Sequence, residues 1–423
     1  MLAKYLGWGS LSDVSSTKID KKYSALLYPT LLYFFSLFII FSGIWIGENY
    51  VVHGPEYVPG STWNILATMW DAKRLTSIAT DGYVWNGNAH QIQNIAYFPL
   101  YSLLEKLLGF AVSLKNPFVL IFPSIIFGLL SALAFYQLAL KLLPENFAKI
   151  SLAGYVFYPG AVFFVRAYPV SLINLLVILT LLALVEGKNW KAALWSGIGS
   201  LSGPLMVFLS LAVVIKWIVD QWQNMKGGVA PSFSKVTSAF TLFLGFSLMA
   251  FSGFVSFLIY QLWAFGNPFA FIQVQSAWEL EPKLITKIYN FFFFNNIVGS
   301  HHPSHFVHAI TQGSLGTRDA HLHYLMNLVI FLILSAFIWY QRKLTPWYFT
   351  LFCVLFLGGY WWFMGSVSGI KATVRLIFPV IPAFLGLGFF AKQYTELAKI
   401  SVIFFAILSF LESELMMQGF WVI

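Results

Sequence analysis

The sequence predicts an all-α polytopic membrane protein, and three observations carry this prediction. Of the 423 residues, 59% are hydrophobic and 10% are charged, whereas a soluble domain carries about 25% charged residues. Apolar runs of about 20 residues recur along the chain, and a helix needs about that length to cross a bilayer. Because these runs are unbroken rather than alternating, we expect helices and not a membrane β-barrel.

The first predicted span, at about 24–46, follows the lysines Lys18, Lys21 and Lys22. Positive charge collects on the cytoplasmic side of membrane proteins, so we expect the N-terminus in the cytoplasm. The next, polar segment, at about 47–115, is then the first outer loop of an integral protein of the cell (inner) membrane, if the source is bacterial.

The apolar run at about 98–114 is short and contains Glu105 and Lys106. Counting it as a span would move lysines such as Lys188 to the outer side, against the same charge rule. We therefore expect an amphipathic helix on the outer surface.

The rest of the chain continues as one membrane domain, residues 1–423, with about 11 spans in total. Its second large outer loop occupies about 266–320. Two short legs are expected to meet outside at Ser202-Gly203-Pro204, although one long kinked helix is an alternative there. The further predicted spans lie at about 116–140, 150–164, 169–185, 192–201, 205–219, 236–265, 321–340, 345–365, 373–391 and 398–413.

Composition also excludes several classes of function. The net charge of +9 comes from Lys and Arg residues scattered between the spans, which indicates membrane topology rather than a nucleic-acid partner. Cys353 is the single cysteine, so an intrachain disulfide is excluded and redox chemistry is not expected. We see no internal sequence repeat, which disfavours a transporter, and nothing in the sequence calls for a cofactor.

A polar cluster in the first outer loop is the main candidate site. Asp71 lies beside Trp70, and a carboxylate beside an aromatic ring at the membrane surface can hold a raised pKa or accept a proton from a hydroxyl. Lys73 and Arg74 follow it and could hold an anionic head group. Asp81 and Tyr83 complete the candidate set. The alternative is a solvated interfacial helix with ordinary charges.

Two arginines in otherwise apolar surroundings are candidates for anion binding. Arg166, near Tyr168, and Arg375 lie at the outer ends of predicted spans, where an arginine often marks a pathway or a bound anion. The guanidinium matches phosphate oxygens in a two-point fashion. The alternative for both is that the side chain extends to the lipid head groups.

The second outer loop offers weaker candidates for substrate binding. His301 and His302 begin a cluster that continues to His308. Because no carboxylate lies within the cluster, hydrogen bonding to an acceptor is preferred to a metal site. Trp278 follows Gln273 and Gln275, and such residues suit a sugar, although an interfacial anchor explains them equally well.

The order of motifs in the first outer loop resembles the PIG-V family. These motifs are Trp70-Asp71-Ala72, then Ile78-Ala79 with Gly82-Tyr83, then Phe98-Pro99-Leu100-Tyr101. The family contains the second mannosyltransferase of GPI-anchor assembly and bacterial relatives within the GT-C superfamily. Looser similarities are Tyr168, the apex at Ser202, Phe265-Gly266-Asn267-Pro268 with Trp278, and Arg375 with Pro379.

The resemblance implies a GT-C-like fold and a glycosyltransferase that moves a hexose, mannose foremost, from a polyprenyl-phosphate donor. The acceptor would be a glycolipid or glycan on the outer face, and the reaction would invert the anomeric centre without a metal. Asp71 would be the base, and Arg375 would hold the donor phosphate. Family members often carry Tyr-x-Glu and an arginine at the apex, whereas Tyr168 is followed by Pro169-Val170-Ser171 here and Ser202-Gly203 precedes Pro204. A non-catalytic or transporter-like protein that binds polyprenyl phosphate is therefore the alternative.

Overall fold

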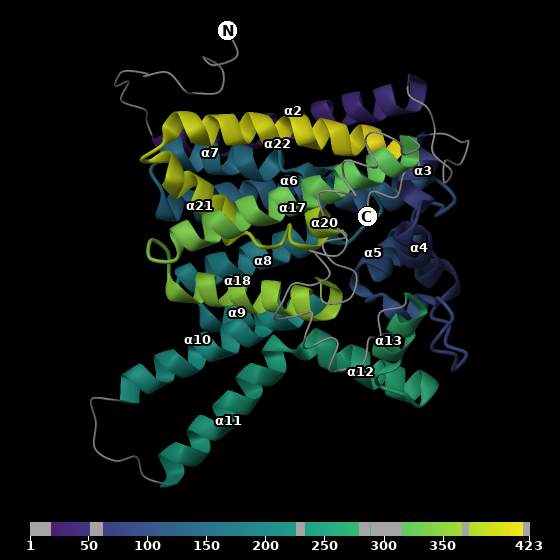
Figure 1. The fold of residues 1–423 in the computed structure, drawn as a ribbon. Helices are drawn as coiled ribbons and strands as arrows, with labels where there is room; N and C mark the ends of the chain where they lie inside the picture. The colour runs from purple at the N-terminus through teal and green to yellow at the C-terminus, as the bar shows by residue number, and fades with distance from the viewer. Residues whose placement is uncertain are drawn as a thin grey trace.

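The computed structural model describes residues 18–50, 62–225, 233–278, 288, 315–365 and 372–417. These residues form helices and turns and contain no strand. Most of the long helices lie roughly parallel in one bundle, and the short helices of the first polar segment gather at one of its ends (Figure 1). The bundle helices are α2 (Lys18–Asn49), α6 (Pro117–Leu142), α7 (Glu145–Val156), α8 (Val170–Val185), α9 (Asn189–Gly199), α17 (Leu315–Gln341), α18 (Trp347–Tyr360), α21 (Pro382–Ala391) and α22 (Thr395–Met417).

The described residues include four helices that are long and apolar enough to cross a membrane, or six if each of two bent pairs counts as one span. Four shorter apolar helices accompany them. The chain is therefore an all-α membrane protein, as predicted, and the number of about 11 spans stays a prediction.

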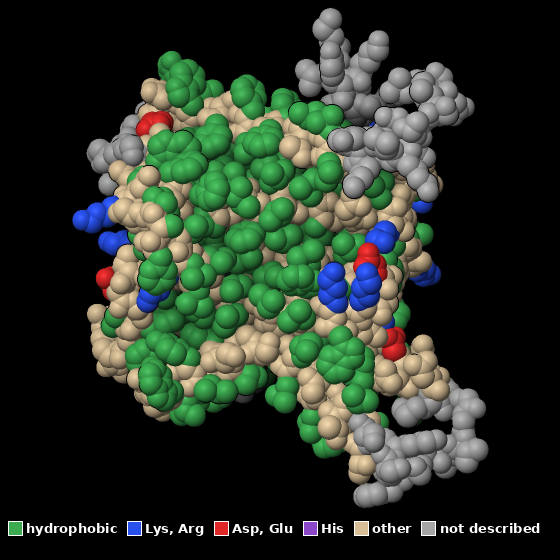
Figure 2. All heavy atoms as spheres, turned by 180° about the vertical axis from the view of Figure 1, so that it is seen from behind, with side chains coloured by type: hydrophobic (Ala, Val, Ile, Leu, Met, Phe, Trp, Pro, Cys, Tyr) green, Lys and Arg blue, Asp and Glu red, His purple; other side chains and the backbone are tan. Residues whose placement is uncertain are grey.

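The surface carries the pattern expected of a protein embedded in lipid. On the face seen in Figure 2, apolar side chains cover the middle, and charged side chains lie toward the two sides. On α2, for example, Phe38 is 66% exposed although it lies in the middle of an apolar helix. Exposed apolar rings in this position are stable in hydrocarbon and costly in water.

Three segments predicted as single spans are broken. Residues 150–164 divide into α7 and a 3₁₀ helix, Pro159–Val165, bent by 69°. Pro159 lies at this break and has no N–H that could continue the helix. Residues 373–391 divide into α20 (Thr373–Leu376) and α21, where Pro379 and Pro382 lack donors in the same way.

Residues 236–265 are the third broken segment and form α11 (Phe233–Ala250) and α12 (Ser252–Phe265), which are bent by 72°. The bend lies where α9 crosses, and Gly197 and Gly253 leave no room there for a Cβ. The backbone N–H of Phe254, which the bend frees, donates to Ser200 Oγ at 2.9 Å. The side chain of Ser200, the C-cap of α9, thus replaces the lost helical hydrogen bond.

The predicted break at Ser202-Gly203-Pro204 is confirmed, but the second leg is not short, because Pro204–Asn224 is long and apolar enough to cross a membrane. α9 ends at Gly199, and a 3₁₀ turn, Pro204–Met206, leads into α10 (Val207–Met225). The alternative of one long kinked helix is therefore wrong.

The first polar segment contains three short helices, α3 (Thr62–Thr68), α4 (Asp71–Asp81) and α5 (Leu100–Gly109). α5 corresponds to the predicted surface helix, and its ten residues extend about 15 Å, too short to cross a hydrocarbon core of about 30 Å. Lys106 is exposed, whereas Glu105 is fully buried and its oxygens have no hydrogen-bond partner. Burial raises the pKa of Glu105 well above its usual value, so burial favours the neutral form of this side chain.

The contact between α2 and α22 depends on two glycines, Gly43 and Gly47, spaced four residues apart. A Cβ at Gly43 would overlap the carbonyl oxygen of Phe410, and one at Gly47 would overlap that of Glu414. Small residues at this spacing let two membrane helices approach backbone to backbone.

We expect Gly43→Ala to destabilise the protein by about 1–3 kcal/mol, because the added methyl group pushes the two backbones apart. Thermal unfolding in detergent, followed by circular dichroism, measures this effect. The control is Gly245→Ala on α11, where an added Cβ has no atom within 4 Å, and it should leave the unfolding temperature unchanged or raise it. Equal destabilisation by the two substitutions would contradict the packing argument.

Candidate active site

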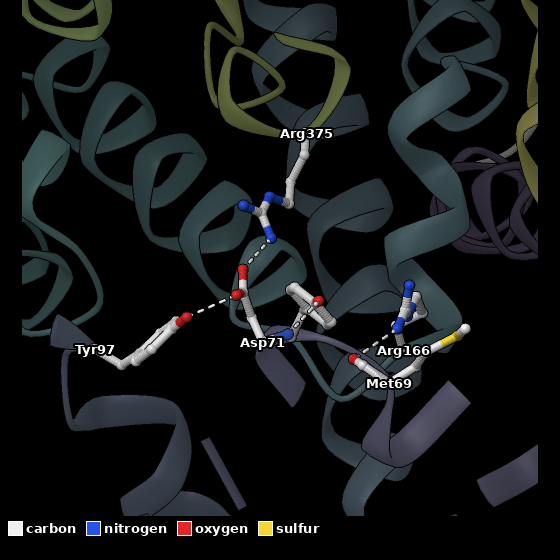
Figure 3. A network of polar contacts seen from close by, with 6 residues as sticks. Met69, Asp71, Tyr97, Arg166 and Arg375 are labelled. Carbon is white, nitrogen blue, oxygen red and sulfur yellow. Dashed lines mark hydrogen bonds and ion pairs between the residues drawn. The ribbon is translucent and has the colours of Figure 1, made fainter. Parts of the chain in front are cut away.

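Asp71 and Arg375, which are 304 positions apart in sequence, meet at the end of the bundle where α3, α4 and α5 lie (Figures 1 and 3). Asp71 is the first residue of α4, where the helix dipole favours a negative charge. Arg375 lies on α20, which is fixed from two sides. The backbone N–H of Val374 donates to Asn327 Oδ1 of α17 at 2.9 Å, and the hydroxyls of Thr373 and Tyr360 lie 2.7 Å apart.

Both elements begin at a strained residue. Among the described residues, the non-glycine residues with positive φ are Trp70, with φ 57°, and Ala372, with φ 55°. Trp70 directly precedes Asp71, and Ala372 is the N-cap of α20. Such conformations cost about 1–3 kcal/mol each and collect at functional sites. The strained residues therefore lie at the starts of α4 and α20, the two helices that bring Asp71 and Arg375 together.

Three polar groups hold the Asp71 residue. Arg375 Nη1 lies 2.6 Å from Oδ2, and the Tyr97 hydroxyl donates to Oδ1 at 2.6 Å. The backbone N–H of Asp71 donates to the Tyr168 hydroxyl at 3.1 Å. Figure 3 shows the carboxylate between Arg375 and Tyr97. Its two oxygens therefore have different partners.

The electrostatics keep this carboxylate ionised, so the possibility of a raised pKa at Asp71 is wrong. Burial raises the pKa of Asp71, but the positive charge of Arg375 and the hydrogen bond from Tyr97 outweigh it and hold the pKa below its usual value. Burial and the charge of Asp71 raise the pKa of Tyr97, so Tyr97 stays protonated and remains a donor. The Asp71 side chain is 24% exposed, so a substrate can reach it.

Arg166 lies near this pair and bonds the backbone at Met69 rather than the carboxylate (Figure 3). Its Nη2 donates to the carbonyl of Met69 at 3.0 Å, and its guanidinium lies 4.7 Å from the Trp70 ring and 4.8 Å from the Tyr168 ring. The side chain is 1% exposed, so it does not extend to lipid head groups. Arg166 thus stabilises the strained turn at Met69 and Trp70, immediately before Asp71.

The site carries more positive charge than it neutralises. The site contains one carboxylate, that of Asp71, and two guanidinium groups, those of Arg166 and Arg375, of which Arg375 contacts the carboxylate. Within the described part of the chain, Nε and Nη1 of Arg166 and Nε of Arg375 are buried and have no hydrogen-bond partner. Unpaired buried donors are costly, and a bound anion would satisfy them.

The other residues of the predicted site lie around the pair rather than against it. Lys73 is exposed, and Arg74 Nη1 donates to the Ile92 carbonyl at 3.5 Å. Asp81 is exposed at the far end of α4, ten residues or about 15 Å from Asp71. Tyr83 contacts the site indirectly, because its hydroxyl donates to the Tyr97 carbonyl at 2.7 Å.

Three predicted substrate-binding residues fall on parts of the chain without a described side chain. His301 and His302 lie outside the described residues, and Trp278 ends a 3₁₀ helix, Val274–Trp278, with its side chain outside them. Their roles stay predictions. Among the described side chains, no group of three or more His, Cys, Asp or Glu residues is arranged to hold a metal ion.

Tyr97 is a contact of Asp71 that was not predicted from the sequence, although it directly precedes the Phe98-Pro99-Leu100-Tyr101 motif. An aromatic residue in an outer loop suits a membrane interface equally well, so its type alone did not reveal the contact with Asp71. Its position next to the motif was the available signal.

Comparison with known proteins adds no family assignment: no protein-family model matches the chain, and no curated protein matches it. The resemblance to the PIG-V family therefore rests on the motifs quoted above. From its geometry alone, the site can accept a proton at an ionised carboxylate and hold an anion at neighbouring guanidinium groups.

Proposed function

We propose that the chain is a membrane glycosyltransferase of the GT-C type that moves a hexose, mannose foremost, from polyprenyl phosphate to the hydroxyl of an extracytoplasmic glycolipid or glycan. The observation that carries the proposal is the Asp71–Arg375 pair, in which an ionised carboxylate lies beside a guanidinium with an unpaired buried donor. A base and an anion site are the two groups that such a transfer needs.

The proposed reaction requires Arg375 to change partner. The donor phosphate takes Arg375 from Asp71, which frees Oδ2. That oxygen removes the proton of the acceptor hydroxyl while the acceptor oxygen attacks the anomeric carbon from the face opposite the phosphate. The bond between the anomeric carbon and the phosphate oxygen breaks, and its electron pair stays on that oxygen. The leaving phosphate thereby gains one negative charge, which Arg375 stabilises. The product is inverted, and the proton remains on Asp71 until solvent takes it.

The distribution of charge supports an active site on the outer face. The connections α17–α18 and α21–α22 lie at the end of the bundle away from α4 and α5 (Figure 1). These two connections hold Arg342, Lys343 and Lys392. By the positive-inside rule, that end is cytoplasmic and Asp71 is outside. About 11 spans, several of them broken, complete the proposed architecture.

The test is transfer by the purified protein in lipid nanodiscs. Polyprenyl-phosphate mannose, or the glucose analogue, is supplied with radiolabelled sugar together with membrane glycolipids as acceptors. We expect label to move to the acceptor without any nucleotide sugar. The absence of transfer from both donors would refute the proposal.

One observation favours a non-catalytic alternative, because both oxygens of Asp71 already have partners, as in a structural ion pair. A protein that binds or moves polyprenyl phosphate would need the arginines but no base. Movement of labelled lipid across the bilayer without sugar transfer would support this alternative.

A further inference from the structure

The proposed function leaves open what holds Asp71 in place when Arg375 moves to the phosphate. Arg375 bonds Oδ2, and Tyr97 bonds Oδ1. When Arg375 has moved to the phosphate, the Tyr97 hydroxyl still donates its hydrogen bond to Oδ1 of Asp71. Among the described side chains it is then the remaining hydrogen-bond partner of this carboxylate. A carboxylate on a freely rotating side chain makes a poor base, since misplacement of about 1 Å can cost about 100-fold in rate.

Tyr97 is held in place by hydrogen bonds within the first polar segment, which also carries Asp71. The Tyr83 hydroxyl donates to the Tyr97 carbonyl at 2.7 Å, and the Tyr97 N–H donates to the Asn94 carbonyl at 3.1 Å. The Tyr83 ring packs against Phe257 of α12, with ring centroids 5.6 Å apart.

Asn94 joins this segment to α4. Its side-chain amide is buried and donates to Ser77 Oγ at 3.1 Å and to the Gly82 carbonyl at 2.9 Å, while its Oδ1 accepts the N–H of Val84 at 2.8 Å. Hydrogen bonds of Asn94 therefore connect the segment of Tyr97 to α4, which carries Asp71. Arg375 lies on a separate helix, α20. The contact with Arg375 can exchange while the contact with Tyr97 persists.

We propose that Tyr97 is a positioning residue of the proposed transfer reaction. It holds Oδ1 of Asp71 and so leaves Oδ2 as the oxygen that takes the acceptor proton. This inference rests on the proposed function for the identity of the reaction, but the hold of Tyr97 on Asp71 can be measured without it.

The pH dependence of the site distinguishes this role from simple packing. The charged and titratable groups around the carboxylate are Arg375 from α20 and the Tyr97 hydroxyl, which contact it, and Arg166 and Tyr168, which lie nearby without a hydrogen bond to its oxygens. The hydrogen bond from Tyr97 lowers the pKa of Asp71, so its loss raises that pKa. Because the base must be ionised, the acid limb of the kcat/KM profile then moves to higher pH.

The test is Tyr97→Phe, which removes the hydroxyl and keeps the ring. We expect kcat to fall about tenfold with KM for polyprenyl-phosphate mannose within twofold, and the acid limb to move upward by on the order of one pH unit. Infrared spectroscopy of protein labelled with ¹³C-aspartate reads the titration of Asp71 directly, and Asp71→Asn assigns the band. The control is Tyr394→Phe, since Tyr394 is 43% exposed after α21.

The outcomes separate the two proposals. An unchanged kcat and an unchanged Asp71 titration in Tyr97→Phe, with an active wild type, overturn the role of Tyr97 and leave the proposed function intact. An inactive wild type in which Tyr97→Phe still raises the pKa of Asp71 overturns the proposed function and supports the hold of Tyr97 on the carboxylate. If Tyr97→Phe does not fold, Tyr83→Phe removes the bond to the Tyr97 carbonyl, and a smaller shift of the same sign is expected.

Discussion

The Asp71→Asn protein should transfer sugar about 10²- to 10⁴-fold more slowly than the wild type, which is the usual contribution of a general base. Asparagine has the same shape and can still accept the Tyr97 hydrogen bond, but at neutral pH it takes no proton and carries no charge for Arg375. Initial rates of transfer from polyprenyl-phosphate mannose in nanodiscs measure the effect.

Asp81→Asn is the matched control, because Asp81 is the last residue of the same helix. It is exposed and lies about 15 Å from Asp71 by helical rise. We expect this variant to keep most of the wild-type rate. Similar losses in both variants would contradict the assignment of the base, and full activity of Asp71→Asn would remove Asp71 from the mechanism.

The fold class was predictable because a helix that crosses the bilayer needs an apolar run of about 20 residues, and such runs are visible in the sequence. The breaks within the predicted spans were not predictable, because a proline does not by itself decide whether a helix ends. Pro29 and Pro123 lie inside the continuous helices α2 and α6, whereas Pro159 follows a sharp bend. Neighbouring helices decide which freed backbone groups find partners, and one sequence does not reveal those neighbours.

The sequence indicated which residues belong to the site, but it did not show which of them contact each other. The charge rule placed Asp71 and Arg375 on one side of the membrane, but their contact spans 304 positions and depends on how α20 is braced. Arg166 shows the difference, since a predicted substrate-binding residue holds the Met69 carbonyl and is 1% exposed. Two strained residues, Trp70 and Ala372, carried no sequence signal, because neither residue type is typical of positive φ.

The second large effect is expected from Arg375→Ala. We expect kcat/KM to fall about 10²- to 10³-fold, because the leaving phosphate loses a charge that strengthens its interaction as the bond breaks. Arg375→Lys keeps the charge but not the two-point geometry, so it should recover about tenfold of that loss. The control is Lys106→Ala on α5, which removes an exposed cation and should leave the rate unchanged.

Arg375→Ala also leaves the Asp71 charge without its ion-pair partner, so part of the lost activity could reflect a weakened fold. Loss of a hydrogen bond to a charged and mostly buried group costs about 1–3 kcal/mol. The double variant Asp71→Asn with Arg375→Gln separates the two causes, because its two side chains are neutral and can bond each other. It should regain most of the wild-type unfolding temperature and remain inactive. Recovery of transfer together with stability would mean that the pair only holds the fold, whereas stability without transfer assigns the pair to the chemistry.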